Sequence, residues 1–280
     1  MPFLYTHLRF GHKCLNKLPD EIKKIVNENL TYFNYGTQGP NIFYYHSPFL
    51  KNKYRKIAED IHNNSIINTL NDSKKLFNTS KYRDQILSYT LGYISHFLLD
   101  SYCNDYIRSS SEKLNISINS IKSEIERYYL NKDKVKTNEP LKTFKKIDIS
   151  ILKEILNVNQ NDIKQSISNF LYYSKLLYIK NKNYTKITTK LLSFTKHKDY
   201  SNFFIYKDNN IDLAQIIRIE KYFEIAVLHY ERLINNYLNF IFNNEKLDLY
   251  YLNKFENNRN DIEIYKLDDE KKYIIKGFLD

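Results

Sequence analysis

The residues best suited to chemistry lie in the middle of the chain and recur at every fourth position. Gly92, His96, Asp100 and Asn104 would line one face of a helix, one turn apart. The rest of residues 91–99 is mostly apolar, so this helix is expected to be buried. A buried carboxylate is costly unless it is paired or bound to a metal, and His96 and Asp100 could chelate one cation, with Gly92 leaving room above them. The alternative is that His96 and Asp100 form a structural hydrogen-bonded pair.

Two further histidines lie on the apolar sides of predicted helices. His7 lies among apolar residues near the start of the chain, and His62 follows an isoleucine on its helix. Each alone is typical of a core histidine with satisfied hydrogen bonds. Together with His96 and Asp100, however, they would supply three imidazoles and one carboxylate from three helices, a set that suits zinc in a helical bundle. The other histidines have no comparable partners and are predicted to be surface or core residues: His12, His46, His197 and His229.

Apolar residues recur with helical periodicity along most of the chain. Pro19 and Asp20 can begin a helix whose apolar stripe continues to Leu30. The segment from Lys81 to about Cys103 is apolar on most sides, which is typical of the central helix of a bundle. Further stripes cover residues 54–61, 118–128, 163–177 and about 211–243. The sequence therefore predicts an all-α fold, a multi-helix bundle.

Two stretches are predicted to be loops, and the C-terminal part to contain short strands. Residues 36–48 hold a cluster of glycine and proline, and the polar residues 131–146 include a further proline. Strand-like alternation occurs at Ile262 and Ile264 and again over residues 273–278, which suggests a hairpin around residues 268–270. We expect one helical domain over residues 1–245 and a C-terminal extension over 246–280. Two independent domains, separated at residues 131–146, are the alternative.

Composition excludes several classes of protein. Five glycines and five prolines in 280 residues are too few for a turn-rich β-sandwich, a collagen-like repeat or a glycine-loop nucleotide fold. The 43 basic and 32 acidic residues give a formal net charge of +11, which could indicate a nucleic-acid or anionic-membrane partner. Acidic residues are interspersed along most of the chain, however, and this favours a mixed, solvated surface.

The expected compartment follows from the cysteines and from the apolar runs. Cys14 and Cys103 are too few and too far apart to suggest a disulfide framework. The N-terminal residues contain no apolar stretch of the length that a signal peptide needs, and no run approaches the roughly 20 residues of a membrane span. We therefore expect no transmembrane segment and a cytoplasmic location.

The motifs YTHLRFG, GPNIFYYHSP and above all TLGYISHFLLDSYCNDYI carry a resemblance to a known family. The chain resembles the prokaryotic zinc-dependent phospholipase C family, well over residues 1–130 and more weakly through HKDYSNFF at His197. The resemblance implies an all-helical fold whose cleft holds up to three zinc ions and hydrolyses the phosphodiester of a phospholipid. It also implies that His7 belongs to one metal site and that His62, His96 and Asp100 form another, with Asp100 bridging toward a neighbouring ion.

Four other ligand positions depart from the family pattern. Where the family has an aspartate after Gly-Pro, this chain has Asn41, a neutral and therefore weak ligand. The histidine expected four residues after Asp100 is Asn104. The helix expected to carry a histidine and a glutamate four residues apart has Ile118 and Lys122. The resemblance therefore predicts that one complete metal site is lost, and that Lys122 places a positive charge where an ion would lie.

These substitutions decide the predicted function. We expect a zinc-dependent phospholipase C-like protein that binds at most one zinc ion and has impaired or no phosphodiester hydrolysis, with catalytic residues left unassigned. Its expected ligand is a phospholipid head group or another phosphate ester, and no nucleic-acid motif is found. One alternative is an active metal-dependent phospholipase or phosphodiesterase with a reduced metal site. The other is a basic protein that binds a membrane surface or nucleic acid.

Overall fold

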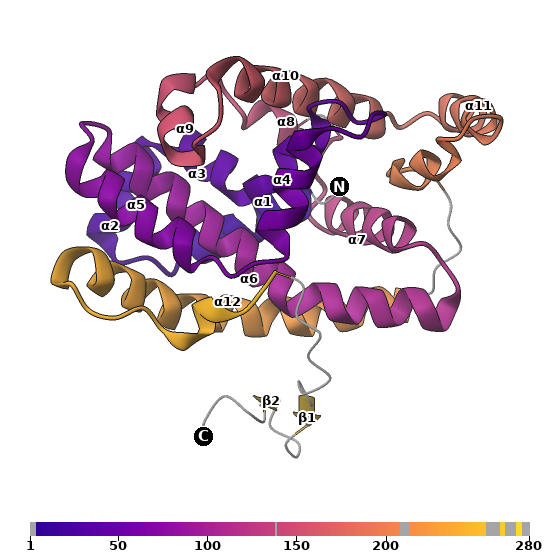
Figure 1. Cartoon of the computed structure of the whole chain (residues 1–280). Helices are drawn as coiled ribbons and strands as arrows, with labels where there is room; N and C mark the ends of the chain where they lie inside the picture. The colour runs from indigo at the N-terminus through magenta and orange to yellow at the C-terminus, as the bar shows by residue number, and fades with distance from the viewer. Residues whose placement is uncertain (1–3, 138, 208–212, 256–263, 267–272, 276–280) are drawn as a thin grey trace.

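The computed structural model of the chain describes residues 4–137, 139–207, 213–255, 264–266 and 273–275, and it shows an all-α protein (Figure 1). This is the predicted fold class. The α-helices are α1 (Leu4–Leu15), α2 (Asp20–Glu28), α3 (Leu30–Gln38), α4 (Lys53–His62), α5 (Ile67–Thr79), α6 (Arg83–Leu114), α7 (Ile118–Lys132), α8 (Glu139–Lys142), α9 (Ile149–Leu156), α10 (Gln160–Leu177), α11 (Lys182–Ser193) and α12 (Leu213–Asn243). The 3₁₀ helices are η1 (Gly39–Tyr45), η2 (Lys198–Phe203) and η3 (Leu249–Leu252).

Helix α6 is the centre of the fold: α1, α2, α3, α5, α7, α9 and α12 pack against it, whereas α4 and α10 pack on η1 and α11 on η2 (Figure 1). Every residue from Ile86 to Asn104 is buried, as the apolar composition of this segment predicts. The helix continues beyond the predicted end near Cys103 to Leu114, where Asn115 ends it in a left-handed conformation with φ of 51°. Neither α6 nor any other helix in the described ranges is long and apolar enough to cross a membrane.

Helix α3 packs directly against the backbone of α6 at two glycines. A Cβ atom on Gly36 would lie 2.1 Å from the carbonyl oxygen of Tyr89, and one on Gly92 would lie 2.2 Å from the carbonyl oxygen of Phe33. Only glycine permits this approach. The role expected for Gly92, leaving room for a cation, is therefore corrected: its missing side chain makes room for α3.

The predicted loop over residues 36–48 is mostly helical. Helix α3 continues to Gln38, and η1 follows at once, because Gly39 adopts a φ of +50° that turns the chain between the two helices. Pro40 fits the start of a helix, and the buried side chains of Ile42 and Phe43 hold η1 in the core. The second predicted loop is irregular apart from its first residues, which end α7, and the short helix α8.

The core is continuous along the described helices and reaches into the predicted C-terminal extension. Buried apolar residues in mutual contact run from Leu4 to Phe255. Tyr250, Tyr251 and Phe255 are all buried, and the hydroxyl of Tyr251 donates to the carbonyl of Leu233 at 2.7 Å. The side chains of Tyr250, Tyr251 and Phe255 therefore belong to the core of the helical bundle.

The last described residues form two short strands. β1 (Ile264–Lys266) and β2 (Tyr273–Ile275) pair antiparallel, with Ile264 opposite Ile275. This pairing agrees with the predicted hairpin. Ile262, the turn at residues 268–270 and the end of the second predicted strand lie outside the described residues.

Candidate metal centre

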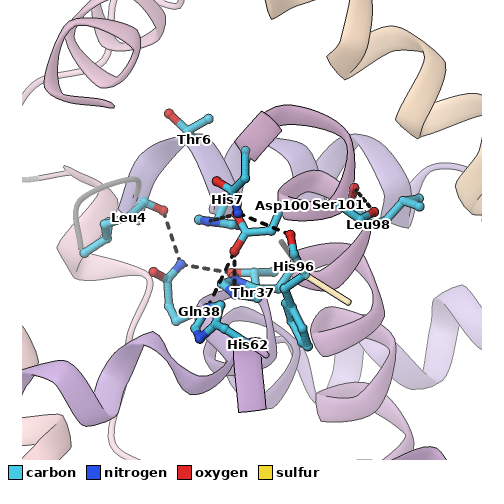
Figure 2. A network of polar contacts seen from close by, with 12 residues as sticks. Leu4, Thr6, His7, Thr37, Gln38, His62, His96, Leu98, Asp100 and Ser101 are labelled. Carbon is cyan, nitrogen blue, oxygen red and sulfur yellow. Dashed lines mark hydrogen bonds and ion pairs between the residues drawn. The ribbon is translucent and has the colours of Figure 1, made fainter. Parts of the chain in front are cut away.

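Three histidines from three helices surround the carboxylate of Asp100 (Figure 2). Nε2 of His7 on α1 lies 3.4 Å from Oδ1 of Asp100. Nε2 of His96 on α6 and Nε2 of His62, the last residue of α4, lie 3.4 Å and 3.6 Å from Oδ2. The ligand atoms of His7, His96 and Asp100 all lie within 4.8 Å of one another. The structure thus brings together the four residues that the sequence singled out, with one carboxylate oxygen facing His7 and the other facing His62 and His96.

Hydrogen bonds on the far side of two rings orient them toward Asp100. Nδ1–H of His62 donates to the carbonyl of Ala58, one turn earlier in α4, at 2.7 Å. Nδ1–H of His96 donates to the carbonyl of Thr37 on α3 at 3.0 Å. Because Nδ1 of His96 carries the proton of its neutral ring, Nε2 of His96 is left with a lone pair on the side of the carboxylate. Metal-bound histidines are typically oriented in this way, with the second ring nitrogen donating to a carbonyl or carboxylate.

Burial keeps His7 and His96 neutral, and neighbouring groups keep Asp100 ionised, which are the protonation states that bind a metal. Burial lowers the pKa of His96 to about 4 and holds the pKa of His7 well below its ordinary value, against the opposing effect of Asp100. Burial alone would raise the pKa of Asp100, but the neighbouring imidazoles and Lys122 outweigh it and keep that pKa below its usual range. At neutral pH the centre therefore presents a carboxylate to neutral rings at His7 and His96, and metal ligands must be deprotonated in this sense.

The spacing of the donor atoms fits a zinc ion. Zinc–nitrogen and zinc–oxygen bonds of about 2.0–2.2 Å place neighbouring ligand atoms of a tetrahedral site roughly 3.4 Å apart. Nε2 of His7 lies 3.4 Å from Oδ1 of Asp100, and the Nε2 atoms of His96 and His62 lie 3.4 and 3.6 Å from Oδ2, so the nitrogens around each carboxylate oxygen are at this spacing. Moreover, Nε2 of His96 is buried and has no hydrogen-bond partner among the described residues, a polar atom that a metal ion would satisfy. The residues present therefore fit the metal that the resemblance implies.

Phe255 covers two of the imidazoles from a segment far away in the sequence. Its ring centroid lies 5.1 Å from that of His62 and 5.7 Å from that of His96, and Phe255 itself is fully buried. His62, the most exposed member of the centre, is only 7% exposed. The centre is therefore closed to bulk solvent. Sequence reasoning missed Phe255, because an aromatic residue so far from the motif has no spacing relative to it that could be recognised.

Glu126 on α7 holds the start of α1, the helix that carries His7. Its carboxylate accepts hydrogen bonds from the backbone N–H of Tyr5, from the backbone N–H of Thr6 at 2.9 Å, from the hydroxyl of Thr6 at 2.5 Å and from the hydroxyl of Tyr178. The backbone N–H groups in the first turn of a helix lack intrahelical partners, and an anion there also interacts favourably with the helix dipole. Burial raises the pKa of Glu126, although these hydrogen bonds oppose the shift. Sequence reasoning missed this residue as well.

The two asparagines at the altered ligand positions take different places. Asn41 lies in η1, half-buried, and has no hydrogen bond to any described residue. Asn104 is buried one turn after Asp100 on α6, and its Nδ2 donates to the carbonyl of Phe255 at 3.3 Å. The amide of Asn104 therefore holds Phe255, which covers the centre, through a hydrogen bond to its backbone. No hydrogen bond in the described part of the chain joins the side chain of either asparagine to the three histidines.

The two altered ligand positions on α7, Ile118 and Lys122, also differ in their relation to the centre. Ile118 begins the helix and is 38% exposed, so it stands apart from the buried centre. Lys122 lies one turn further on, and its charge lowers the pKa values of His7, His96 and Asp100. Glu126 follows Lys122 by four residues and is fully buried. Glu126 therefore contacts α1, and the charge of Lys122 acts on the centre, whereas Ile118 lies at the exposed start of α7.

Three histidines that were expected to lack comparable partners have polar partners. Nε2 of His12 bonds Oδ1 of Asn34 at 2.9 Å, and Nδ1 of His229 bonds the hydroxyl of Tyr102 at 2.8 Å. Nε2 of His46 lies 3.5 Å from a carboxylate oxygen of Asp162. These are pairwise contacts across helices that sequence spacing does not reveal. Among the described residues, the group of His7, His96 and Asp100 is the one set of three or more candidate ligands within metal-binding distance.

The depressed histidine pKa values predict that acid destabilises the metal-free protein. His96, with a pKa of about 4 in the folded state and about 6.5 when unfolded, binds a proton more readily in the unfolded chain. The pKa of His229 is likewise lowered to about 4, chiefly by burial. Stability is therefore complete above about pH 6.5 and falls as the pH drops toward 4. We expect a loss on the order of 2 kcal/mol from His96 between pH 7.5 and pH 5, measured by urea unfolding in a chelator.

The variant His96→Gln, measured in the same way, should have a flatter pH dependence than the unmodified protein. Equal unfolding free energies at pH 7.5 and pH 5 for the unmodified chain would contradict the assignment of buried neutral imidazoles.

Comparison with known proteins agrees with the all-α fold. Residues 6–223 match the family described as zinc dependent phospholipase C, and the chain belongs to that family. The match covers His7, His62, His96 and Asp100 and ends before Phe255. Comparisons with curated proteins and with solved structures gave no significant match.

Proposed function

We propose that the chain binds a single zinc ion at Asp100 and the surrounding histidines, and that it hydrolyses phosphodiesters weakly or not at all. The observation that carries the proposal is a carboxylate in contact with three imidazoles inside a closed site. The ligand expected from the family is a phospholipid head group or another phosphate ester. In the family chemistry, bound metal ions activate water and neutralise charge on the phosphate.

The closure of the site supports weak or absent hydrolysis. Structural zinc sites are closed by protein ligands, whereas catalytic sites keep one position open for water or substrate. Here His7, His96 and Asp100 are 1%, 0% and 4% exposed, and Phe255 packs against the rings of His62 and His96. A phosphate group could reach these ligands only if Phe255 moved away.

The charges around the site support one metal ion rather than several. Asp100 is the one carboxylate in direct contact with the histidines within the described residues. The carboxylate of Glu126 accepts hydrogen bonds from α1 and from Tyr178. The neutral amide of Asn104 donates a hydrogen bond to the backbone carbonyl of Phe255. Lys122 adds a positive charge that acts on His7, His96 and Asp100. A second divalent cation would therefore lack the negative charge that holds several metal ions close together.

The direct test is the zinc content of the purified protein. After equilibration with zinc and removal of the excess, elemental analysis should return one zinc ion per chain. A chelator should remove this ion without unfolding the bundle, because the core extends well beyond the centre. Two or three tightly held ions per chain would contradict the single-site proposal, and an absence of zinc would contradict the metal centre itself.

A second candidate function is an active hydrolase whose centre opens when the C-terminal segment moves. The observation that favours it is that Phe255, which covers His62 and His96, comes from outside the matched residues 6–223. Zinc-dependent hydrolysis of phosphatidylcholine separates the two candidates. Activity gained in Phe255→Ala, but not in the control Phe242→Ala on the surface of α12, would establish the second candidate. No activity in either variant would support the closed zinc centre, and activity of the unmodified chain that His96→Ala abolishes would overturn it.

A further inference from the structure

Helix α11 presents a row of exposed apolar side chains. Ile187, Leu191 and Phe194, the residue that ends the helix, are 60%, 63% and 79% exposed. Their spacing of four and three residues places them on one side of the helix. Exposed apolar residues are ordinary when scattered singly, but a contiguous row rimmed by polar residues marks an interaction surface. We call this row and the exposed lysines of residues 180–198 the α11 face.

The lysines of this region make the α11 face strongly basic. Residues 163–198 contain eight lysines and no aspartate or glutamate, in a chain whose formal net charge is +11. All eight are exposed, and six of them lie on or beside α11, at positions 180, 182, 186, 190, 196 and 198. Lys186 and Lys190 flank the apolar row on the helix itself. The expectation of an evenly mixed surface is therefore wrong for this part of the molecule.

The opposite side of α11 is packed, so the exposed row is not the inner side of a loose helix. Thr185 is buried, and Thr188 and Leu192 line an apolar hollow of about 150 Å³ together with residues of α10, η2 and the segment before α4. Phe49 lines the same hollow, and its ring lies 5.4 Å from that of His197, just beyond α11. In Figure 1, α11 lies at the edge of the bundle, far from α12. The helix thus packs against η2 on one side and presents the α11 face on the other.

We propose that the α11 face binds the surface of an anionic phospholipid membrane. A helix with apolar side chains on one side and lysines beside them lies in the membrane interface, with the apolar row at the boundary of head groups and acyl chains. Lysines close to an anionic leaflet each contribute attraction to its lipids. Nucleic acid would satisfy the lysines but leave Ile187, Leu191 and Phe194 in water. The inference does not depend on the metal centre or on hydrolysis, since it concerns a separate part of the surface.

A single tryptophan can report insertion, because the chain has none of its own. Leu191→Trp places the reporter in the α11 face, and Leu228→Trp places it at a similarly exposed position on α12, 66% exposed. With vesicles of phosphatidylcholine and phosphatidylserine, in the presence of a chelator, we expect a blue shift of the Leu191→Trp emission and none for Leu228→Trp. Vesicles of phosphatidylcholine alone should give little shift. Equal responses of the two reporters, or none from Leu191→Trp, would overturn the proposal.

Reversing the charge of two lysines tests the electrostatic attraction between the α11 face and anionic lipids, and a second pair of lysines serves as the matched control. Lys186→Glu with Lys190→Glu should weaken binding to the anionic vesicles roughly tenfold or more, because each lysine near the surface contributes on the order of a fivefold gain in affinity. Lys24→Glu with Lys113→Glu makes the same change of net charge at exposed positions on α2 and α6 and should have little effect. Two results would overturn the proposal that the α11 face binds a membrane. One is that both pairs of substitutions weaken binding to the anionic vesicles equally, and the other is that the Leu191→Trp emission responds to duplex DNA but not to vesicles. Since a chelator is present throughout, failure of this proposal and failure of the zinc proposal are separate results.

Discussion

Replacing Asp100 by asparagine is expected to lower zinc affinity by more than about 100-fold. Asparagine keeps the shape of the side chain but removes the negative charge that faces His7, His62 and His96 at 3.4–3.6 Å. Loss of a residue that only supports a metal ligand already costs roughly 10- to 100-fold in affinity, so loss of the charged ligand itself should cost more. Competition with a chromophoric zinc chelator measures the change.

The control for this prediction is Asp199→Asn, which removes a carboxylate from the exposed surface at η2. Its zinc affinity should equal that of the unmodified protein. Circular dichroism shows whether each variant retains its helices. If the Asp100→Asn protein is folded and its zinc affinity is unchanged, zinc binds at another site, and the proposed metal centre at Asp100 is wrong.

Replacing Glu126 by alanine is expected to destabilise the fold by about 3 kcal/mol or more. The substitution leaves two backbone N–H groups of α1 and the hydroxyls of Thr6 and Tyr178 without their acceptor in a buried place. Each unsatisfied buried donor costs about 1–3 kcal/mol, and part of this cost is recovered where water can enter. For a chain of this size the melting temperature should fall by roughly 10 °C. Because Thr6 precedes His7, zinc affinity should fall as well.

Two variants separate the hydrogen bonds of Glu126 from general effects of the substitution. Glu126→Gln keeps the length of the side chain and one acceptor oxygen, so it should lose less stability than Glu126→Ala. Glu112→Ala removes an exposed glutamate from the last turns of α6 and should leave the melting temperature nearly unchanged. If Glu126→Ala melts at the same temperature as the unmodified protein, Glu126 does not hold α1 in place.

Local patterns in the sequence determine the helices and the central motif. The apolar composition around Leu91 and Leu99 predicts a buried helix, and α6 is buried throughout that region. Helical spacing alone places His96 and Asp100 on one face, because residues four apart are neighbours on any helix. The basic character of residues 163–198 is equally a property of the sequence, visible once acidic residues are counted there. In each case the residues concerned lie close together in the chain, so the periodicity or composition of a single segment is enough to predict the feature.

Only the tertiary structure decides which distant groups meet. His7, His62 and Asp100 approach one another because α1 packs beside α6 and α4 packs on η1, which itself contacts α6, while α3 reaches α6 through Gly36 and Gly92. The position of Phe255 over the centre and the hydrogen bonds from α1 to Glu126 arise from contacts between segments more than 100 residues apart in the chain. The same holds for the outward direction of the apolar row on α11, since the packing of its other side decides which face meets solvent. Such contacts depend on how whole helices pack, and no spacing within a single segment encodes them.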